Sequence, residues 1–137
     1  DEAEALMRGE TGSWLTAPGW PHEDTVAGLS FGHNGGDQYV IVDDEGRLAG
    51  ECGTKGPSRD GVVEIGYGLT APSRGHGLGA RAVTDLLGLL RERPEITVIE
   101  AEVHITNTAS RRIVERLGFA TDGAPSQGYL RYRLTVR

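Results

Sequence analysis

The sequence predicts a single mixed α/β domain whose sheet begins antiparallel, and three observations support this prediction. Stretches with period-two hydrophobicity, such as Val62–Leu69 and Tyr129–Val136, lie on both sides of helical stretches. The segment Leu78–Leu90 carries apolar residues at helical spacing. A chain of 137 residues is long enough to hide roughly two thirds of its unfolded surface in one core. We therefore expect residues 1–137 to form one domain, with no linker or internal repeat.

The first half of the chain is predicted to contain two helices and then a pair of strands. Glu2–Leu15 has an irregular helical pattern, and a short capped helix is expected over about Asp24–Phe31. Tyr39–Val42 and Arg47–Thr54 are predicted strands. They are joined by a hairpin turn in which Gly46 takes a positive φ.

The central strand is predicted over Val62–Leu69. Its side chains alternate, so that one face points to the core and the other is open to a ligand. The face assigned to the core contains Val63, Ile65, Tyr67 and Leu69. The face assigned to a ligand contains Glu64, Gly66 and Gly68.

The elements after the central strand follow from periodicity and capping. The helix Leu78–Leu90 ends before Pro94, and a strand is expected over Ile96–Ile105. A final helix begins at Asn107 or Thr108 and runs through Leu117, closed by a glycine. Two last strands are expected over Phe119–Thr121 and Tyr129–Val136.

Composition and charge exclude several classes of function. A net charge of −6 with one lysine, Lys55, argues against a nucleic-acid partner and suits a cationic amine substrate. Cys52 stands alone, so no disulfide framework, no thiolate zinc site and no other metal site is expected. No apolar run approaches the roughly 20 residues that cross a bilayer. We expect a cytoplasmic protein with no membrane partner.

Three alternating glycines mark a junction between the central strand and the helix that follows. Within Arg74–Ala80, the glycines Gly75, Gly77 and Gly79 reach positive φ readily and leave backbone N–H groups open to an anion. The start of the next helix adds unpaired N–H groups and the positive end of its dipole. The pattern indicates a phosphate-bearing cofactor, and a tight glycine turn without a ligand is the alternative.

Two motifs at matching spacing resemble the GNAT superfamily of acyl-CoA-dependent N-acetyltransferases. Arg74, Gly77 and Gly79 occupy the fixed positions of its Q/R-x-x-G-x-G/A signature. Asn107-Thr108-Ala109-Ser110 followed by Gly118-Phe119 is similar to the branch that acetylates ribosomal-protein N-termini, as is Glu64-Ile65-Gly66-Tyr67. The resemblance covers about Tyr39 to Leu134. It implies the GNAT fold, a central mixed and mostly antiparallel sheet flanked by helices, and leaves open whether the first strand is missing from a chain that opens at Asp1.

The resemblance also implies a donor and the residues that bind it. Acetyl-CoA is the expected acyl donor, although another acyl group such as succinyl stays open. Its pantetheine arm is expected beside the edge of Val62–Leu69, where Gly66 and Gly68 permit a close approach. The residues expected to bind the donor are Leu69, Arg74, Gly75, His76, Gly77, Leu78, Gly79, Ala80, Asn107 and Ser110.

Three catalytic roles are implied by the same resemblance. The backbone N–H of Leu69 is expected to stabilise the oxyanion that develops on the thioester carbonyl. Many GNAT enzymes use a tyrosine to protonate the thiolate, but Val114 stands at that position, so Ser110 is the expected acid. Glu64 is the expected base, directly or through water, with Glu102 and His104 as further candidates. The carboxylate that the branch carries near the last hairpin has no match in residues 124–127.

The sequence gives fewer indications of the residues that contact the acceptor amine. His22, Glu23, Asp24 and His104 are the expected substrate contacts. The acceptor is a protein N-terminus or a small-molecule amine, acylated by direct transfer in a ternary complex. A covalent intermediate on Cys52 is disfavoured, because a single strand cysteine usually behaves as a small buried hydrophobe. The sequence leaves the oligomeric state open, a homodimer included.

Two other functions remain in view. Gly75–Ala80 also fits the dinucleotide fingerprint G-x-G-x-x-A, with Glu100 at a suitable distance for a ribose. This pattern would indicate a fragment of a dinucleotide-binding oxidoreductase. Three features count against it: Thr70–Arg74 separates the strand from the first glycine, Glu100 lies within a strand, and the remaining chain is short. A GNAT-like module that binds acyl-CoA or a partner without catalysis is the other alternative.

Overall fold

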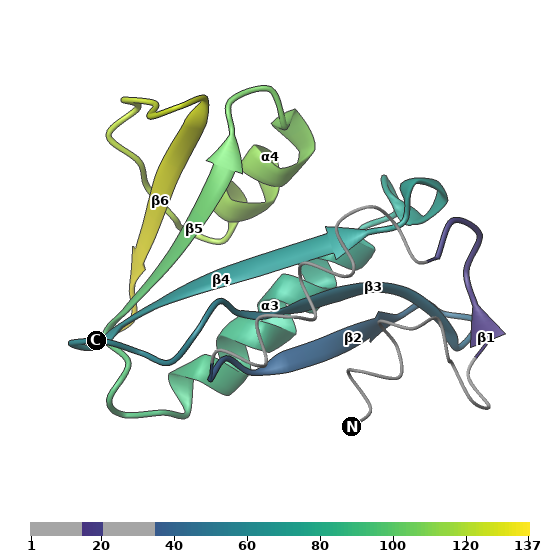
Figure 1. Ribbon diagram of the computed structural model, residues 1–137, viewed down its shortest axis with the longest axis horizontal. Helices are drawn as coiled ribbons and strands as arrows, with labels where there is room; N and C mark the ends of the chain where they lie inside the picture. The colour runs from purple at the N-terminus through teal and green to yellow at the C-terminus, as the bar shows by residue number, and fades with distance from the viewer. Residues whose placement is uncertain (1–14, 21–34) are drawn as a thin grey trace.

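The computed structural model describes residues 15–20 and 35–137 of the chain (Figure 1). In chain order the elements are β1 (Leu15–Thr16), β2 (Gln38–Val42), β3 (Arg47–Thr54), β4 (Val62–Leu69), the 3₁₀ turn η2 (Ala71–Ser73), α3 (Leu78–Arg91), β5 (Val98–His104), α4 (Thr108–Arg116) and β6 (Tyr129–Thr135). The helices predicted over 2–15 and 24–31 fall outside the described residues, except that Leu15 begins a strand.

The strands form one mixed sheet, as predicted. The order is β1-β3-β4-β5-β6, and β2 also pairs with β3. The pairs β1–β3 and β4–β5 are parallel, and the other pairs are antiparallel. The turn between β2 and β3 contains Gly46 at φ 78°, the positive value expected there.

The sheet divides between β4 and β5, and this division positions the site. The two parallel strands pair only from Val62 opposite Val98 to Ile65 opposite Ala101. Beyond that point β4 remains paired with β3, whereas β5 remains paired with β6. Figure 1 shows the two halves of the sheet diverging toward the carboxyl ends of β4 and β5. We call this gap between the two strands the fork.

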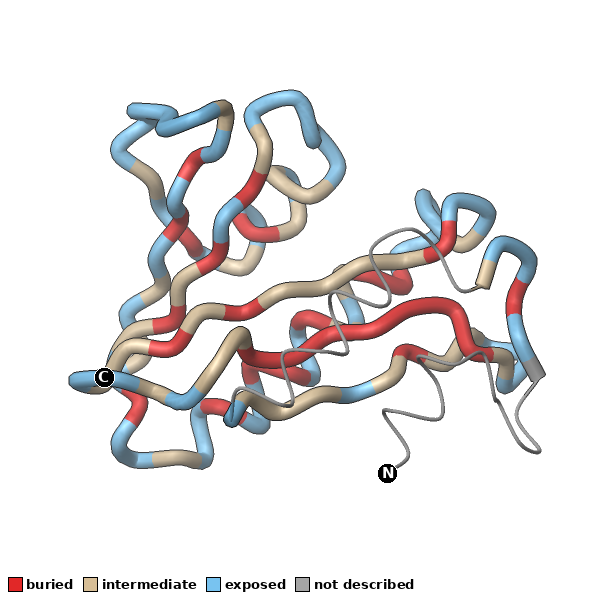
Figure 2. The backbone as a smooth tube through the Cα atoms, in the orientation of Figure 1, coloured by how far each residue is buried: buried red, intermediate tan, exposed pale blue. Residues whose placement is uncertain are grey.

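Both helices pack on the same face of the sheet. Helix α3 covers β3 and β4, and α4 covers β5 and β6, where Val114 is fully buried. The buried residues form one main core, visible as the red tube in Figure 2. Its members on the strands beside the fork are Val63, Ile65, Ile99, Ala101 and Val103. The opposite face of β5 and β6 carries charged side chains.

Two predicted details differ from the structure. The strand expected over Phe119–Thr121 is a single bridge between Ala120 and Arg133. The β4 face assigned to the core is buried at Val63 and Ile65, but Tyr67 and Leu69 are only half-buried. The reason is the fork, which removes β5 from beside the end of β4. No helix in residues 15–20 and 35–137 is long and apolar enough to cross a membrane.

Candidate functional site

The glycine loop before α3 leaves backbone N–H groups without a partner in the helix. Gly75 and Gly77 have φ of 82° and 80°, and Gly77 is the N-cap of α3. The first helical bond runs from the Arg81 N–H to the Gly77 carbonyl, at 3.1 Å. The N–H groups of the residues between them therefore have no partner within the helix. These donors and the positive end of the α3 dipole favour an anion such as a pyrophosphate.

The third glycine, Gly79, is needed for close packing rather than for a left-handed backbone. A Cβ on Gly79 would lie 3.2 Å from the Cδ1 of Ile113 and 3.5 Å from a methyl of Leu69. Gly79 therefore lets the start of α3 approach α4 and the end of β4. Arg74 donates from its Nε to the Leu69 carbonyl at 3.1 Å, which ties the loop to β4. His76 is exposed on the same loop.

The end of β4 directs backbone groups into the fork. The N–H groups of Lys55 and Thr70 donate to Glu64 and Ala49 across β3–β4, both at 2.8 Å. Hydrogen-bonded pairs alternate with non-hydrogen-bonded pairs in an antiparallel ladder. Tyr67 and Leu69 therefore occupy non-hydrogen-bonded positions, and their N–H groups point away from β3. Because β5 has already diverged, these donors face the fork.

Two hydroxyl groups meet at the fork. The Oη of Tyr67, on β4, lies 2.5 Å from the Oγ of Ser110, on α4. Burial raises the pKa of Tyr67 above its ordinary value, and the bond to Ser110 opposes this shift. Asn107 caps α4 by accepting from the Ser110 N–H at 3.1 Å. The cap fixes the start of α4, and with it the Ser110 hydroxyl, beside β4.

A second set of contacts fastens α4 to the sheet. Tyr132 on β6 is fully buried and donates from its hydroxyl to Glu115 at 2.7 Å. Arg111 donates to the same hydroxyl at 3.3 Å and to the Ile105 carbonyl at 3.1 Å. These bonds join α4 to the β5–β6 half of the sheet, so Ser110 is attached to that half.

Two cavities meet at the Tyr67–Ser110 pair. The helix-face cavity has a volume of about 380 Å³ and lies between the end of β4 and the starts of α3 and α4. The charged-face cavity has a volume of about 350 Å³ and opens on the other side of the fork. Tyr67, Asn107 and Ser110 line both cavities. The Tyr67–Ser110 pair is therefore the boundary that the two cavities share at the fork.

The charged-face cavity has polar walls from four strands. Glu51 on β3 is only 3% exposed, and its register partner across β3–β4 is Gly68. On the far wall, His104 stacks edge-on against Tyr129, with ring centroids 5.1 Å apart. The Nδ1 of His104 accepts from the Thr106 N–H at 3.2 Å, which leaves its proton on Nε2 in the neutral ring.

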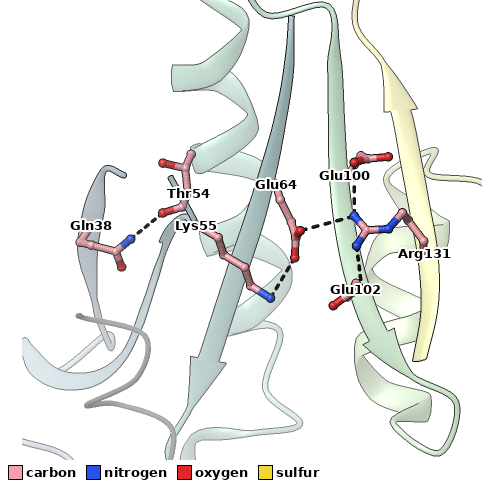
Figure 3. A network of polar contacts seen from close by, with 7 residues as sticks. All are labelled: Gln38, Thr54, Lys55, Glu64, Glu100, Glu102 and Arg131. Atoms are coloured by element: carbon pink, nitrogen blue, oxygen red, sulfur yellow. Dashed lines mark hydrogen bonds and ion pairs between the residues drawn. The ribbon is translucent and has the colours of Figure 1, made fainter. Parts of the chain in front are cut away.

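A network of ion pairs crosses the same face of the sheet (Figure 3). Arg131 on β6 reaches Glu102 at 2.7 Å, Glu100 at 3.2 Å and Glu64 at 3.4 Å. Glu64 also pairs with the Nζ of Lys55 at 3.0 Å. The network therefore bridges both sides of the fork at its closed end.

The structure brings five of the predicted donor-binding residues together at one cavity, whereas Leu78 is buried in the core and lines two other cavities. Leu69, Arg74, Gly79, Asn107 and Ser110 all line the helix-face cavity. His22, Glu23 and Asp24 lie outside the described residues.

Other candidates occupy different surroundings from those expected. Glu64 lines a separate hollow beside Lys55 and Arg59, and its carboxylate is held by the ion pairs described above. Glu102 and His104 line the charged-face cavity. The face that Gly66 was expected to open to a ligand is crossed by the Lys55 side chain, whose Cε lies 3.1 Å from the position of an added Cβ. Burial raises the pKa of the Cys52 thiol to about 11, which keeps it protonated and unreactive.

Three residues of the site were not singled out from the sequence. Tyr67 was assigned to the core by alternation, and Glu51 and Lys55 were placed in a strand and a loop without a role. The register between β3 and β4 would have drawn attention to Glu51, because it faces a glycine on the ligand strand. The hydroxyl contact of Tyr67 depends on where α4 packs, which no local pattern reports.

The chain matches known proteins along most of its length. Residues 3–120 match the family model described as an acetyltransferase (GNAT) domain. An uncharacterized N-acetyltransferase of Bacillus subtilis (strain 168), YjdG, is 27% identical over 111 residues. That match covers 73% of this chain and 66% of the Bacillus protein.

Solved structures share the fold at low sequence identity. The ribosomal-protein-S5-alanine acetyltransferase from Vibrio fischeri superposes with a TM-score of 0.69 at 18% identity, over 98% of this chain and 87% of that one. The aminoglycoside acetyltransferase AAC(6')-Ib, solved in complex with coenzyme A, gives 0.67 at 22% identity, over 98% and 89%. The ribosomal L7/L12 alpha-N-protein acetyltransferase RimL gives 0.65 at 19% identity, over 82% and 78%.

Proposed function

This chain belongs to the GNAT acetyltransferase family, and we propose that it moves the acetyl group of acetyl-CoA to a primary amine by direct transfer in a ternary complex. One observation carries the proposal. Two cavities on opposite faces of the sheet share Tyr67 and Ser110 as their boundary, so a donor on the helix face and an acceptor on the charged face would meet at this pair without a covalent enzyme intermediate.

The helix-face cavity and the glycine loop fit an acyl-CoA donor. Gly75 and Gly77 adopt the left-handed backbone that the loop requires, and the first N–H groups of α3 offer donors to a pyrophosphate. The outward N–H groups of Tyr67 and Leu69 and the outward Tyr67 carbonyl match the two amides of a pantetheine arm, whereas the Leu69 carbonyl is occupied by Arg74. The donor supplies an activated acyl group, and the Leu69 N–H stabilises negative charge that develops on its carbonyl oxygen.

The charged-face cavity is the proposed entry for the amine. The buried Glu51 lines this cavity and favours a bound ammonium group through its charge. It is well placed to take the proton that the ammonium must lose before attack. Glu64, the base expected from the sequence, contacts an amine in this cavity only after Lys55 moves aside or through water.

Ser110 is the proposed donor of a proton to the departing thiolate. The Ser110 hydroxyl lies at the junction of the cavities, where the sulfur of the donor leaves. The Tyr67 hydroxyl passes a proton to Ser110 across their 2.5 Å contact and then regains one from solvent through the charged-face cavity, which it also lines. Burial, which raises the pKa of Tyr67, favours the neutral hydroxyl from which this transfer starts. This pair takes the place of the family's tyrosine, whose position is held by the buried Val114.

Calorimetry with acetyl-CoA, CoA and NAD tests the donor. We expect both CoA species to bind and NAD not to bind. Binding of NAD alone would favour the dinucleotide alternative and end this proposal.

A thiol-release assay with a panel of amines tests the reaction. The panel includes peptides with free N-termini, aminoglycosides and aliphatic amines, with succinyl-CoA as a second donor. Binding of acetyl-CoA with no thiol release for any amine would favour the non-catalytic acyl-CoA-binding module.

A further inference from the structure

The chain's one lysine lies across the central strand. Lys55 follows β3 directly, and its side chain passes over β4 to reach the Glu64 carboxylate (Figure 3). The crossing point is Gly66, where an added Cβ would lie 3.1 Å from the Lys55 Cε. The absence of a side chain at Gly66 therefore makes room for the lysine stem.

Lys55 separates two hollows. On one side lies the charged-face cavity. On the other lies an outer cavity of about 650 Å³, lined by Lys55, Gly56, Pro57, Arg59, Val62, Glu64 and Glu100. Among the residues that the structure describes, Lys55 alone lines both. Its stem is the wall that ends the charged-face cavity.

The ion pair that anchors the Lys55 ammonium at Glu64 exchanges easily. The Lys55 and Glu64 side chains are 29% and 26% exposed, and ion pairs of such exposure are weak. The lysine stem is flexible and its ammonium is a compact charge. When Lys55 moves, Glu64 keeps its contact with Arg131 at 3.4 Å. Displacement of Lys55 therefore leaves the Glu64 carboxylate beside a cation.

We propose that Lys55 is a movable partition that sets the length of the acceptor, and that linear amines with a distal ammonium group are the acceptors that displace it. A distal ammonium replaces the Lys55 ammonium at Glu64 and enters a cavity that Glu100 also lines. The reacting amine stays in the charged-face cavity near Glu51. This inference rests on the proposed function, because it assumes that the acceptor enters by that cavity.

Acceptors of graded length test the partition. The kcat/KM for ethylamine, hexylamine and hexamethylenediamine is measured with acetyl-CoA for the wild type, Lys55→Ala and Lys55→Met. In Lys55→Ala we expect the kcat/KM for hexamethylenediamine, divided by the kcat/KM for ethylamine, to rise about tenfold. Differences in pocket size discriminate substrates over this range. Hexylamine gains less, because it brings no ammonium to Glu64. Lys55→Met keeps an unbranched stem over Gly66. The kcat/KM for hexylamine relative to ethylamine should therefore stay near the wild-type value in this variant.

Arg116→Ala is the matched control, since Arg116 is exposed in the last turn of α4 and lines neither cavity. Its kcat/KM values for the two longer amines relative to ethylamine are expected to equal those of the wild type. Two results would overturn the proposal. One is that the kcat/KM values relative to ethylamine are unchanged in Lys55→Ala. The other is that the relative kcat/KM for hexylamine rises equally in Lys55→Ala and Lys55→Met.

A structural readout separates this inference from the proposed function. A crystal structure of Lys55→Ala with hexamethylenediamine is expected to show an ammonium within hydrogen-bond distance of Glu64 and one continuous cavity. Two separate cavities, or no diamine at Glu64, overturn the partition whether or not the chain is active. Absence of acetyl transfer to every amine by the wild type, in contrast, counts against the proposed function.

Discussion

Tyr67 and Ser110 come from different halves of the sheet and place two hydroxyl groups at one point. Tyr67 belongs to β4, whereas Ser110 is carried by α4, which Arg111 and Tyr132 fasten to β6. Each hydroxyl needs the other to complete its hydrogen bonds in a half-buried site. We therefore expect the pair to act as one unit in proton transfer.

A double-mutant cycle tests this coupling. Tyr67→Phe and Ser110→Ala are each expected to lower kcat by about 10²-fold, because general acid catalysis contributes at least that much. The double variant should be little worse than either single one, as is found for residues that act together. Tyr39→Phe, on β2 and away from the fork, serves as the control and should leave kcat unchanged. Multiplicative losses, or unchanged turnover in Ser110→Ala, would contradict the relay.

Cys52 gives a prediction about pH and stability. It lies opposite Tyr67 in the β3–β4 register, and burial raises its pKa from 9.0 to about 11. As pH rises through this window, the unfolded chain loses the thiol proton before the folded chain does. The unfolded state then binds fewer protons, so the free energy of unfolding falls. We expect a loss of about 1–3 kcal/mol across the window, and none from this group below pH 8.

Urea denaturation at several pH values measures this loss. The variant Cys52→Ala is less stable at neutral pH because it removes buried volume, but its stability should fall less steeply with pH. Equal slopes for the two proteins would show that Cys52 ionises as readily in the folded state as in the unfolded one.

At the scale of elements, the loop and the first turn of α3 form a single binding feature. Gly77 is required for its left-handed backbone, whereas Gly79 is required for the contact between α3 and α4. Sequence spacing alone treats these glycines as equivalent members of one motif. Their different surroundings predict different consequences of substitution.

Substitutions along α3 check this assignment. Gly77→Ala places a Cβ at φ 80°, which costs about 1–2 kcal/mol and displaces the loop. We expect the Kd for CoA to rise about tenfold, measured by calorimetry. Gly88→Ala is the matched control, because Gly88 lies within the helix with nothing within 4 Å of an added Cβ. It should stabilise the protein by about 0.5–1 kcal/mol and leave the Kd unchanged.

At the scale of the whole molecule, two half-sheets are held together at the closed end of the fork. The four-residue pairing of β4 with β5 is supplemented by Arg131, which joins Glu64 on one side to Glu100 and Glu102 on the other. Three carboxylates converge there, so the arginine also relieves their mutual repulsion. The opening of the fork thus depends on a charge network as well as on backbone pairing.

Removing the arginine tests this dependence. Arg131→Met is expected to lower the free energy of unfolding by up to about 1 kcal/mol at low salt, since the side chains involved are partly exposed. The loss should shrink at high ionic strength, where the remaining carboxylates are screened. Arg133→Met, which removes one pair to Glu100, should have a smaller effect. A loss that does not change with salt would indicate packing rather than charge.

Much of the fold could be predicted because local patterns are strong from β3 onward. The bounds of β3 and β4 agree with their alternation and flanking turns, and α3 agrees within one residue. The family prediction from Arg74, Gly77 and Asn107–Ser110 is confirmed by the match over residues 3–120. The role expected for Leu69 stays a prediction, although the β3–β4 register directs its N–H into the fork.

The sequence by itself determined the elements, the family and the glycine loop, because each depends on residues close together in the chain. Only the tertiary structure decided which side chains share the fork. Tyr67 meets Ser110 across 43 residues, and Arg131 meets Glu64 across 67. Such contacts depend on strand register and on the angle at which β4 and β5 diverge, and neither is encoded in local periodicity. For the same reason Lys55, a loop residue directly after β3 in the sequence, becomes a wall between two cavities in the fold.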